Sequence, residues 1–158
     1  MHMENERYMR RALELAKQAA EEGETPIGAV ITRKGEIIAE GRNRRERGKN
    51  ALLHAEIEAI DAACKTLGGW RLWECELYVT LEPCPMCAGA IINARIPWVI
   101  YGARDPKAGC CGSVADLFAL PFNHEPIAEG GMLEDECAAI LTEFFRKLRG
   151  KWHGVQSG

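Results

Sequence analysis

Residues 80–91 read TLEPCPMCAGAI, and the interpretation of the whole chain starts from this stretch. Within it, Cys84 and Cys87 form a Cys-x-x-Cys pair at the start of a segment with helical character. Such a pair places two sulfur atoms on one face of a helix, where the helix dipole lowers the pKa of the thiols. Because thiolates bind metal ions, the stretch predicts a metal site at a helix N-terminus.

Two thiolates do not complete a zinc site, and a third ligand is predicted in the run LLHAEIEAI, which contains His54. The remaining histidines lie near the termini or in a polar loop: His2, His124 and His153. One histidine and two cysteines leave the fourth tetrahedral position open, which is typical of catalytic rather than structural zinc. We therefore predict that His54, Cys84 and Cys87 bind one Zn²⁺ per subunit.

Glu56 lies two residues after His54 and is the predicted acid and base. A zinc site with two thiolates is formally neutral, so it acidifies water less than a site of three imidazoles and needs a base nearby. His-x-Glu followed by Pro-Cys-x-x-Cys is the signature of zinc-dependent nucleobase deaminases, in which the glutamate is the general acid and base. Since residues i and i+2 of a helix point to different sides, His54 should lie at the very start of its helix.

The cysteine pair allows two other interpretations. A thioredoxin-like redox pair would leave His54 and Glu56 without a role. A noncatalytic zinc protein that binds RNA would need no base beside an open coordination position. A metal-dependent enzyme is the interpretation that uses all four residues.

Length and composition limit the class of protein. The 158 residues suit one domain, predicted over residues 1–151, with a mobile tail over 152–158. The chain contains no apolar run long enough to cross a membrane, and its polar start, MHMENERYMRR, lacks the apolar stretch of a secretory signal, so we expect a cytoplasmic protein. Seven cysteines, an odd number, favour reduced thiols over disulfides. The net charge of −3 does not by itself indicate a nucleic-acid-binding protein, although a local cluster of basic residues could still bind nucleic acid.

The apolar periodicity predicts alternating helices and strands. Helices are predicted at 4–22, 54–67, 86–94, 114–120 and 133–151, and strands at 27–32, 37–40, 76–81, 98–102 and 127–129. The second helix should bury Ile57, Ile60, Cys64 and Leu67. The last helix should begin with acidic residues and end with basic ones, which matches the helix dipole. This alternation indicates an α/β fold with the metal ligands at helix starts, where open α/β sheets bind their ligands.

Two loops remain open to more than one interpretation. The segment GRNRRERGKN at 41–50 is rich in arginine, and it is either a solvated loop or a strip that contacts RNA phosphates through Arg42, Arg44 and Arg45. Cys110 and Cys111 are adjacent in a glycine-rich loop and are either plain loop thiols or ligands of a second metal.

Nearly the whole chain resembles the bacterial tRNA-specific adenosine deaminases of the cytidine deaminase-like superfamily. The resemblance is carried by TPIGAV, the Asn43 segment, HAEIEAI, LYVTLEPCPMCAGAI, YGARDPKAG and DECAAILTEFFR. The zinc motif alone would suit any superfamily member, including cytosine and guanine deaminases. The YGARDPKAG-x-x-GS loop and the DEC-x-x-x-L-x-x-FFR end point to the tRNA branch, although small residues without thiols would be expected at Cys110 and Cys111.

The resemblance implies a fold, an activity and a set of residue roles. The fold would have three α/β/α layers with a mixed five-stranded central sheet. The protein would be a homodimer that binds a tRNA anticodon stem-loop and converts the wobble adenosine to inosine; the alternative is a free nucleobase or nucleoside deaminase. The residues carried over for binding the substrate are Asn43 at the base edge, Ala55 and Ile27 in the base pocket, Asp105 and Lys107 near the anticodon strand, and Phe145 on the terminal helix.

Overall fold

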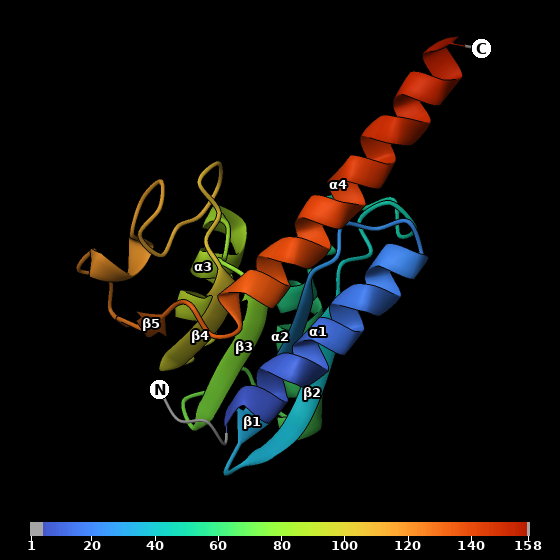
Figure 1. The fold of residues 1–158 in the computed structure, drawn as a ribbon. Helices are drawn as coiled ribbons and strands as arrows, with labels where there is room; N and C mark the ends of the chain where they lie inside the picture. The colour runs from blue at the N-terminus through green and yellow to red at the C-terminus, as the bar shows by residue number, and fades with distance from the viewer. Residues whose placement is uncertain (1–4, 158) are drawn as a thin grey trace.

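The computed structural model describes the backbone of residues 5–157 and the side chains of residues 5–150. Its centre is a five-stranded sheet in the order β2-β1-β3-β4-β5 (Figure 1). The strands are β1 (Gly28–Arg33), β2 (Glu36–Arg42), β3 (Cys75–Leu81), β4 (Trp98–Ala103) and β5 (Ile127–Glu129). β1 is antiparallel to β2 and β3, whereas β3, β4 and β5 are parallel. The mixed five-stranded sheet expected from the sequence is confirmed.

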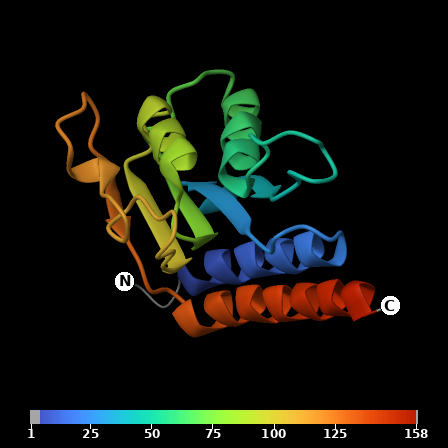
Figure 2. The ribbon, with the colours of Figure 1, turned by 90° about the horizontal axis from the view of Figure 1, so that it is seen from above.

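Helices cover both faces of this sheet (Figure 2). Helices α1 (Glu6–Glu21) and α4 (Glu134–Ser157) lie side by side on one face, and an ion pair between Arg10 and Glu136 joins them. Helices α2 (Ala55–Leu67) and α3 (Pro85–Asn93) cover the other face. The three predicted layers are therefore present, with the helices that carry the predicted metal ligands together on one side.

Alternating side chains of the central strands explain why both faces are covered. In β1, Ala29 and Ile31 pack under α2 and α3, whereas Val30 packs with α1 and α4. In β3, Leu77 and Tyr78 divide between the two faces in the same way. Because successive strand residues point to opposite faces, a strand that is apolar at every position requires a helix layer on each side.

The buried face of α2 differs from the prediction. The sequence pattern predicted that larger side chains would be buried, but these four are only partly buried: Ile57, Ile60, Cys64 and Leu67. The fully buried positions are small: Ala55, Ala59 and Ala63. The reason is the close approach of β2, where a Cβ atom added to Gly41 would lie 2.2 Å from the carbonyl oxygen of Ala55. Because Gly41 has no side chain, β2 can approach the backbone of α2 this closely, which holds the start of α2 tightly against the sheet.

Two element boundaries also differ. The helix predicted at 114–120 is only a short 3-10 helix, η2, at Leu117–Ala119. Helix α4 continues to Ser157, so the basic cluster of Arg146, Lys147 and Arg149 lies before its last turn rather than in it. The last residues of the predicted tail are therefore helical as far as Ser157; Gly158 and the side chains beyond residue 150 lie outside the described part, and the mobility of residues 152–158 stays a prediction. Among the described helices, none combines the length and apolarity needed to cross a membrane.

Candidate metal centre

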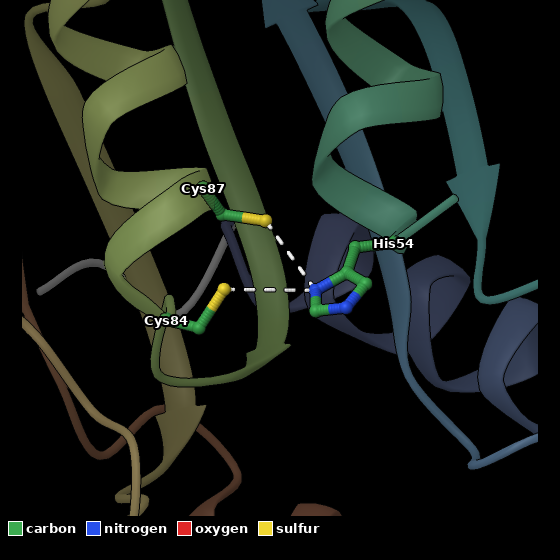
Figure 3. Close-up of side chains that lie close together, drawn as sticks. All are labelled: His54, Cys84 and Cys87. Atoms are coloured by element: carbon green, nitrogen blue, oxygen red, sulfur yellow. Dashed lines mark hydrogen bonds between the residues drawn. The ribbon is translucent and has the colours of Figure 1, made fainter. Parts of the chain in front are cut away.

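The three predicted ligands come together between the N-termini of α2 and α3 (Figure 3). His54 is the N-cap residue of α2 and Cys84 is the N-cap residue of α3, and both have extended backbone conformations. Pro85 occupies the first position of α3, where its missing N–H removes no helical hydrogen bond. Cys87 lies in the first turn of α3 and is fully buried. The predicted placement of His54 at the start of its helix is confirmed.

The distances between the ligand atoms fit a tetrahedral metal ion. The Nδ1 atom of His54 lies 3.6 Å from the Sγ atom of Cys84 and 3.7 Å from that of Cys87. Zinc bonds of about 2.3 Å to sulfur and about 2.0–2.1 Å to nitrogen place tetrahedral neighbours about 3.6 Å apart. All three ligand atoms lie within 4.8 Å of one another. The group can therefore bind a metal ion without rearrangement.

The two thiols differ in their electrostatic environment. A hydrogen bond from Cys87, together with His54, lowers the pKa of Cys84 to about 4 despite its partial burial. The hydrogen bond to Cys84 and burial raise the pKa of Cys87. Hydrogen bonding to Cys84 also raises the pKa of His54, while burial of the ring and the positive charge of Arg45 oppose this. These shifts favour a thiolate at Cys84 next to His54, which is a charge arrangement that attracts a divalent cation.

Glu56 is the predicted acid and base, and its side chain is only 4% exposed. It lies in the first turn of α2 and is hydrogen-bonded to Cys87. Burial raises the pKa of Glu56 to about 7, and the negative charge of Cys84 acts in the same direction. A carboxyl group that titrates near neutral pH both accepts and donates protons readily.

Asn43 and Ile27 lie together at the end of the hairpin. The backbone N–H of Asn43 donates to the carbonyl oxygen of Ile27 at 3.1 Å, and its side-chain amide donates to that of Thr25 at 3.3 Å. Asn43 is only 4% exposed, so its side chain has a fixed orientation. Ala55, the first residue of α2, is fully buried directly beside His54 and Glu56.

The other residues predicted to bind the substrate lie farther apart. The side chain of Asp105 accepts hydrogen bonds from the backbone N–H groups of Lys107 and Ala108, so it shapes its own turn and leaves Lys107 exposed. Phe145 is 41% exposed on α4 and packs against Phe144. Since α4 lies on the opposite face of the sheet from α2 and α3, the structure does not bring Phe145 into the metal group (Figure 2).

The three arginines predicted to contact RNA phosphates have different surroundings. Arg42 is paired with Glu22 at 2.7 Å, and Arg44 is paired with Glu58. Among the described side chains, the acidic partner of Arg45 is Glu46, at 4.0 Å, and Arg45 lies close enough to His54 to lower the pKa of the imidazole. Arg45 is therefore the arginine of this segment whose charge is available near the metal group.

Sequence reasoning missed two buried carboxylates that hold the loops beside the site. Glu24 is fully buried and accepts hydrogen bonds from the backbone N–H groups of Glu46 and Arg47, at 2.9 and 2.7 Å. Glu82 is 2% exposed and accepts four hydrogen bonds from the loop after β4. Burial alone would raise the pKa of Glu82, but the hydrogen bonds from Ser113 and from three backbone amides outweigh burial and lower it. For Glu82, the one indication in the sequence is its position directly before the Pro-Cys-x-x-Cys pair.

The adjacent thiols Cys110 and Cys111 do not form a second metal group. Within the described residues, the group of His54, Cys84 and Cys87 is the one cluster with ligand atoms close enough to share an ion. Burial raises the pKa of both Cys110 and Cys111, which favours neutral thiols. The cysteines are free in the structure, as predicted for reduced thiols.

Residues 3–149 match the family model of the MafB19-like deaminases. The tRNA-specific adenosine deaminase of Bacillus subtilis strain 168 is 51% identical over 149 residues, which are 94% of this chain and 92% of the relative. The chain belongs to the tRNA-specific adenosine deaminase family. A solved structure from studies of A-to-I editing by tRNA:A34 deaminases at the wobble position is 46% identical to this deaminase, with a TM-score of 0.83 over 85% of this chain and 99% of that one. The guanine deaminase of Bacillus subtilis is 40% identical, with a TM-score of 0.63 over 81% of this deaminase and 83% of that chain.

Proposed function

We propose that this deaminase hydrolyses the wobble adenosine of a tRNA anticodon loop to inosine, with zinc held by His54, Cys84 and Cys87. The observation that carries the proposal is the spacing of these three ligand atoms, which fits a tetrahedral ion beside the buried carboxyl group of Glu56. The tRNA substrate is supported by the relatives, one of which is named as a tRNA-specific adenosine deaminase.

Different residues of the chain would hold the metal ion and transfer the protons. A zinc ion in this site would supply a Lewis acid that makes water a better nucleophile at neutral pH. Glu56 takes a proton from the attacking water and passes protons to the ring nitrogen of adenine and then to the departing ammonia. Because the buried Glu56 titrates near neutral pH, one residue can serve as base and then as acid.

Asn43, Ala55 and Ile27 would orient the base for this chemistry. The reacting carbon of adenine is inaccessible inside a duplex, so the base must come from a single-stranded loop or leave its stack. The side-chain amide of Asn43 donates to the carbonyl oxygen of Thr25 and accepts from the backbone N–H of Arg45, and it would face the base edge in this fixed orientation. Ala55 is the first residue of α2, next to Glu56, and would line the base pocket through its backbone.

A comparison of substrates tests the proposed function. We expect an anticodon stem-loop with adenosine at the wobble position to be deaminated with a kcat/KM at least about 100-fold above that of free guanine, cytosine or adenosine, because small substrates lose the binding energy of remote contacts. The measurement is ammonia release together with inosine detection in the RNA. Equal or greater turnover of free guanine would instead support a free-base deaminase, the function named for the guanine deaminase with 40% identity.

Charge reversal at Arg45 should weaken RNA binding. Arg45→Glu is expected to reduce affinity and to make the slope of log K against log salt shallower by about 0.7–0.9, the change for one lost phosphate contact. Arg71→Glu is the matched control, because it makes the same charge change at an exposed arginine beside Cys75, at the opposite end of the sheet, and Arg71 forms no ion pair in the described part of the chain. An unchanged salt slope in Arg45→Glu would identify the segment as a solvated loop. Arg42 and Arg44 are less clean test positions, since their replacement also breaks the ion pairs with Glu22 and Glu58.

The remaining features follow from the same proposal. The enzyme would be a homodimer that acts in the cytoplasm, with a tRNA anticodon stem-loop as its partner. Residues 1–151 would form a single zinc-dependent deaminase domain. Asp105, Lys107 and Phe145 would contact RNA outside the reacting base. Lys107 and Phe145 are exposed, and Asp105 is partly exposed.

A further inference from the structure

Glu82 connects the metal ligands to a loop that is distant in sequence. It lies between the end of β3 and the ligand Cys84, and its carboxylate accepts hydrogen bonds from the backbone N–H groups of Asp105 (3.1 Å), Cys111 (2.9 Å) and Ser113 (3.1 Å). The hydroxyl group of Ser113 donates a fourth, at 2.5 Å. All four donors belong to residues 104–113, here called the Glu82 loop. Burying a carboxylate is costly without such donors, so this loop and this side chain require each other.

The Glu82 loop also packs tightly around the carboxylate. A Cβ atom added to Gly109 would lie 2.4 Å from the carboxyl group of Glu82. The backbone N–H of Cys110 donates to the carbonyl oxygen of Pro83 at 2.8 Å, immediately before Cys84. The loop is therefore held directly against the turn that supplies a metal ligand.

Two cations project from this loop. Arg104 and Lys107 are exposed, and neither forms an ion pair with an acidic side chain in the part of the chain that the structure describes. Because this loop is held against the turn that carries Cys84, a polyanion that reaches the metal group with one of its bases would pass close to the loop. The direction of the loop, and hence of these charges, is set by the buried contacts of Glu82.

We propose that Glu82 is a positioning residue for the RNA substrate, which fixes the Glu82 loop so that Arg104 and Lys107 face the backbone next to the reacting base. This inference rests on the proposed function, because it requires an RNA substrate. Glu82 itself touches neither the reacting atoms nor the RNA. Its loss should therefore raise KM for RNA and leave the chemical step and the metal in place.

Three variants test this role from different sides. Glu82→Gln keeps the shape of the side chain but replaces one acceptor oxygen with a donor. Gly109→Ala leaves Glu82 intact and pushes the loop away from it. Ser113→Ala removes a single exposed donor and is the mildest of the three. Glu74→Gln is the matched control, since Glu74 is an exposed glutamate paired with Arg33 at the opposite end of the sheet.

We expect Glu82→Gln and Gly109→Ala to raise KM for an anticodon stem-loop about 10- to 100-fold. Ser113→Ala should raise it about 3- to 10-fold. These changes are of the order expected when buried hydrogen-bonding groups lose their partners. We expect kcat within about threefold of the wild type, full zinc content, and faster amide hydrogen exchange confined to residues 104–113 in Glu82→Gln. Glu74→Gln should match the wild type in every measurement.

The two proposals fail in different ways. A wild-type protein that does not deaminate the stem-loop refutes the proposed function. A wild-type protein that does so, with KM unchanged in Glu82→Gln and Gly109→Ala, overturns only the role of Glu82. Loss of zinc, or a fall in kcat at constant KM, would also overturn it, because Glu82 would then support the metal turn rather than the loop.

Discussion

Replacement of Glu56 by alanine is expected to lower kcat by about 10²–10⁴-fold while the metal stays bound, because this is the usual contribution of a positioned acid and base. Glu56 is hydrogen-bonded to Cys87, but its oxygen atoms are not part of the ligand group. The measurements are single-turnover deamination of a stem-loop and zinc analysis of the same preparation. Glu56→Gln should show the same loss, because the amide keeps the shape of the side chain and cannot exchange protons at this pH.

The matched control for this experiment is Asp61→Asn. Asp61 is an exposed carboxylate on the same helix, paired with Lys65 at 2.9 Å. Asp61→Asn removes one carboxylate from α2, as Glu56→Gln does, and should leave kcat unchanged. Deamination at a normal rate by Glu56→Ala would remove Glu56 from the mechanism, and a joint loss of zinc would reassign it to the support of the metal site.

The three residues of the candidate metal group could be predicted from the sequence because the motifs that contain them are local. Cys84 and Cys87 lie within one turn of a helix, and His54 and Glu56 lie within another, so each pair is visible as a short motif. The strands were also predictable, since most residues on both faces of β3 and β4 are buried and the two sequences are apolar except at Glu76 and Thr80. What remained to be found was how the two helix starts meet, which the close packing of α2 and α3 on one face provides.

Long-range polar contacts could not be predicted from the sequence. Glu82 is hydrogen-bonded to residues 23 and 31 positions later, and glutamates are usually exposed, so its place directly before the Pro-Cys-x-x-Cys pair does not identify the loop that it contacts. The sequence of the arginine-rich segment fits either a solvated or an RNA-binding loop, whereas the structure pairs Arg42 and Arg44 with Glu22 and Glu58. In the same way, the basic cluster of α4 is typical of a helix end, although a helix can continue past such charges.

Replacement of Cys87 by serine tests the metal centre itself. A serine hydroxyl group does not ionise near neutral pH, so it cannot replace a thiolate in the position now occupied by the buried Sγ atom of Cys87. Changes outside the ligand shell alone reduce metal affinity by about 10–100-fold, so removal of a ligand should lower both zinc content and activity by more than about 100-fold. Metal analysis and deamination of the stem-loop measure the two losses in parallel.

Thermal unfolding separates a lost ligand from a damaged fold. Zinc that binds the folded state raises Tm, and at a free concentration 100 times Kd it contributes about 2.7 kcal/mol. Added zinc should therefore raise Tm of the metal-free wild type but not of Cys87→Ser. Cys64→Ser is the matched control, because Cys64 is partly buried on α2 and lies outside the ligand group. Stoichiometric zinc in Cys87→Ser would exclude Cys87 as a ligand, and a redox role for the Cys84 and Cys87 pair would then regain its place as the competing explanation.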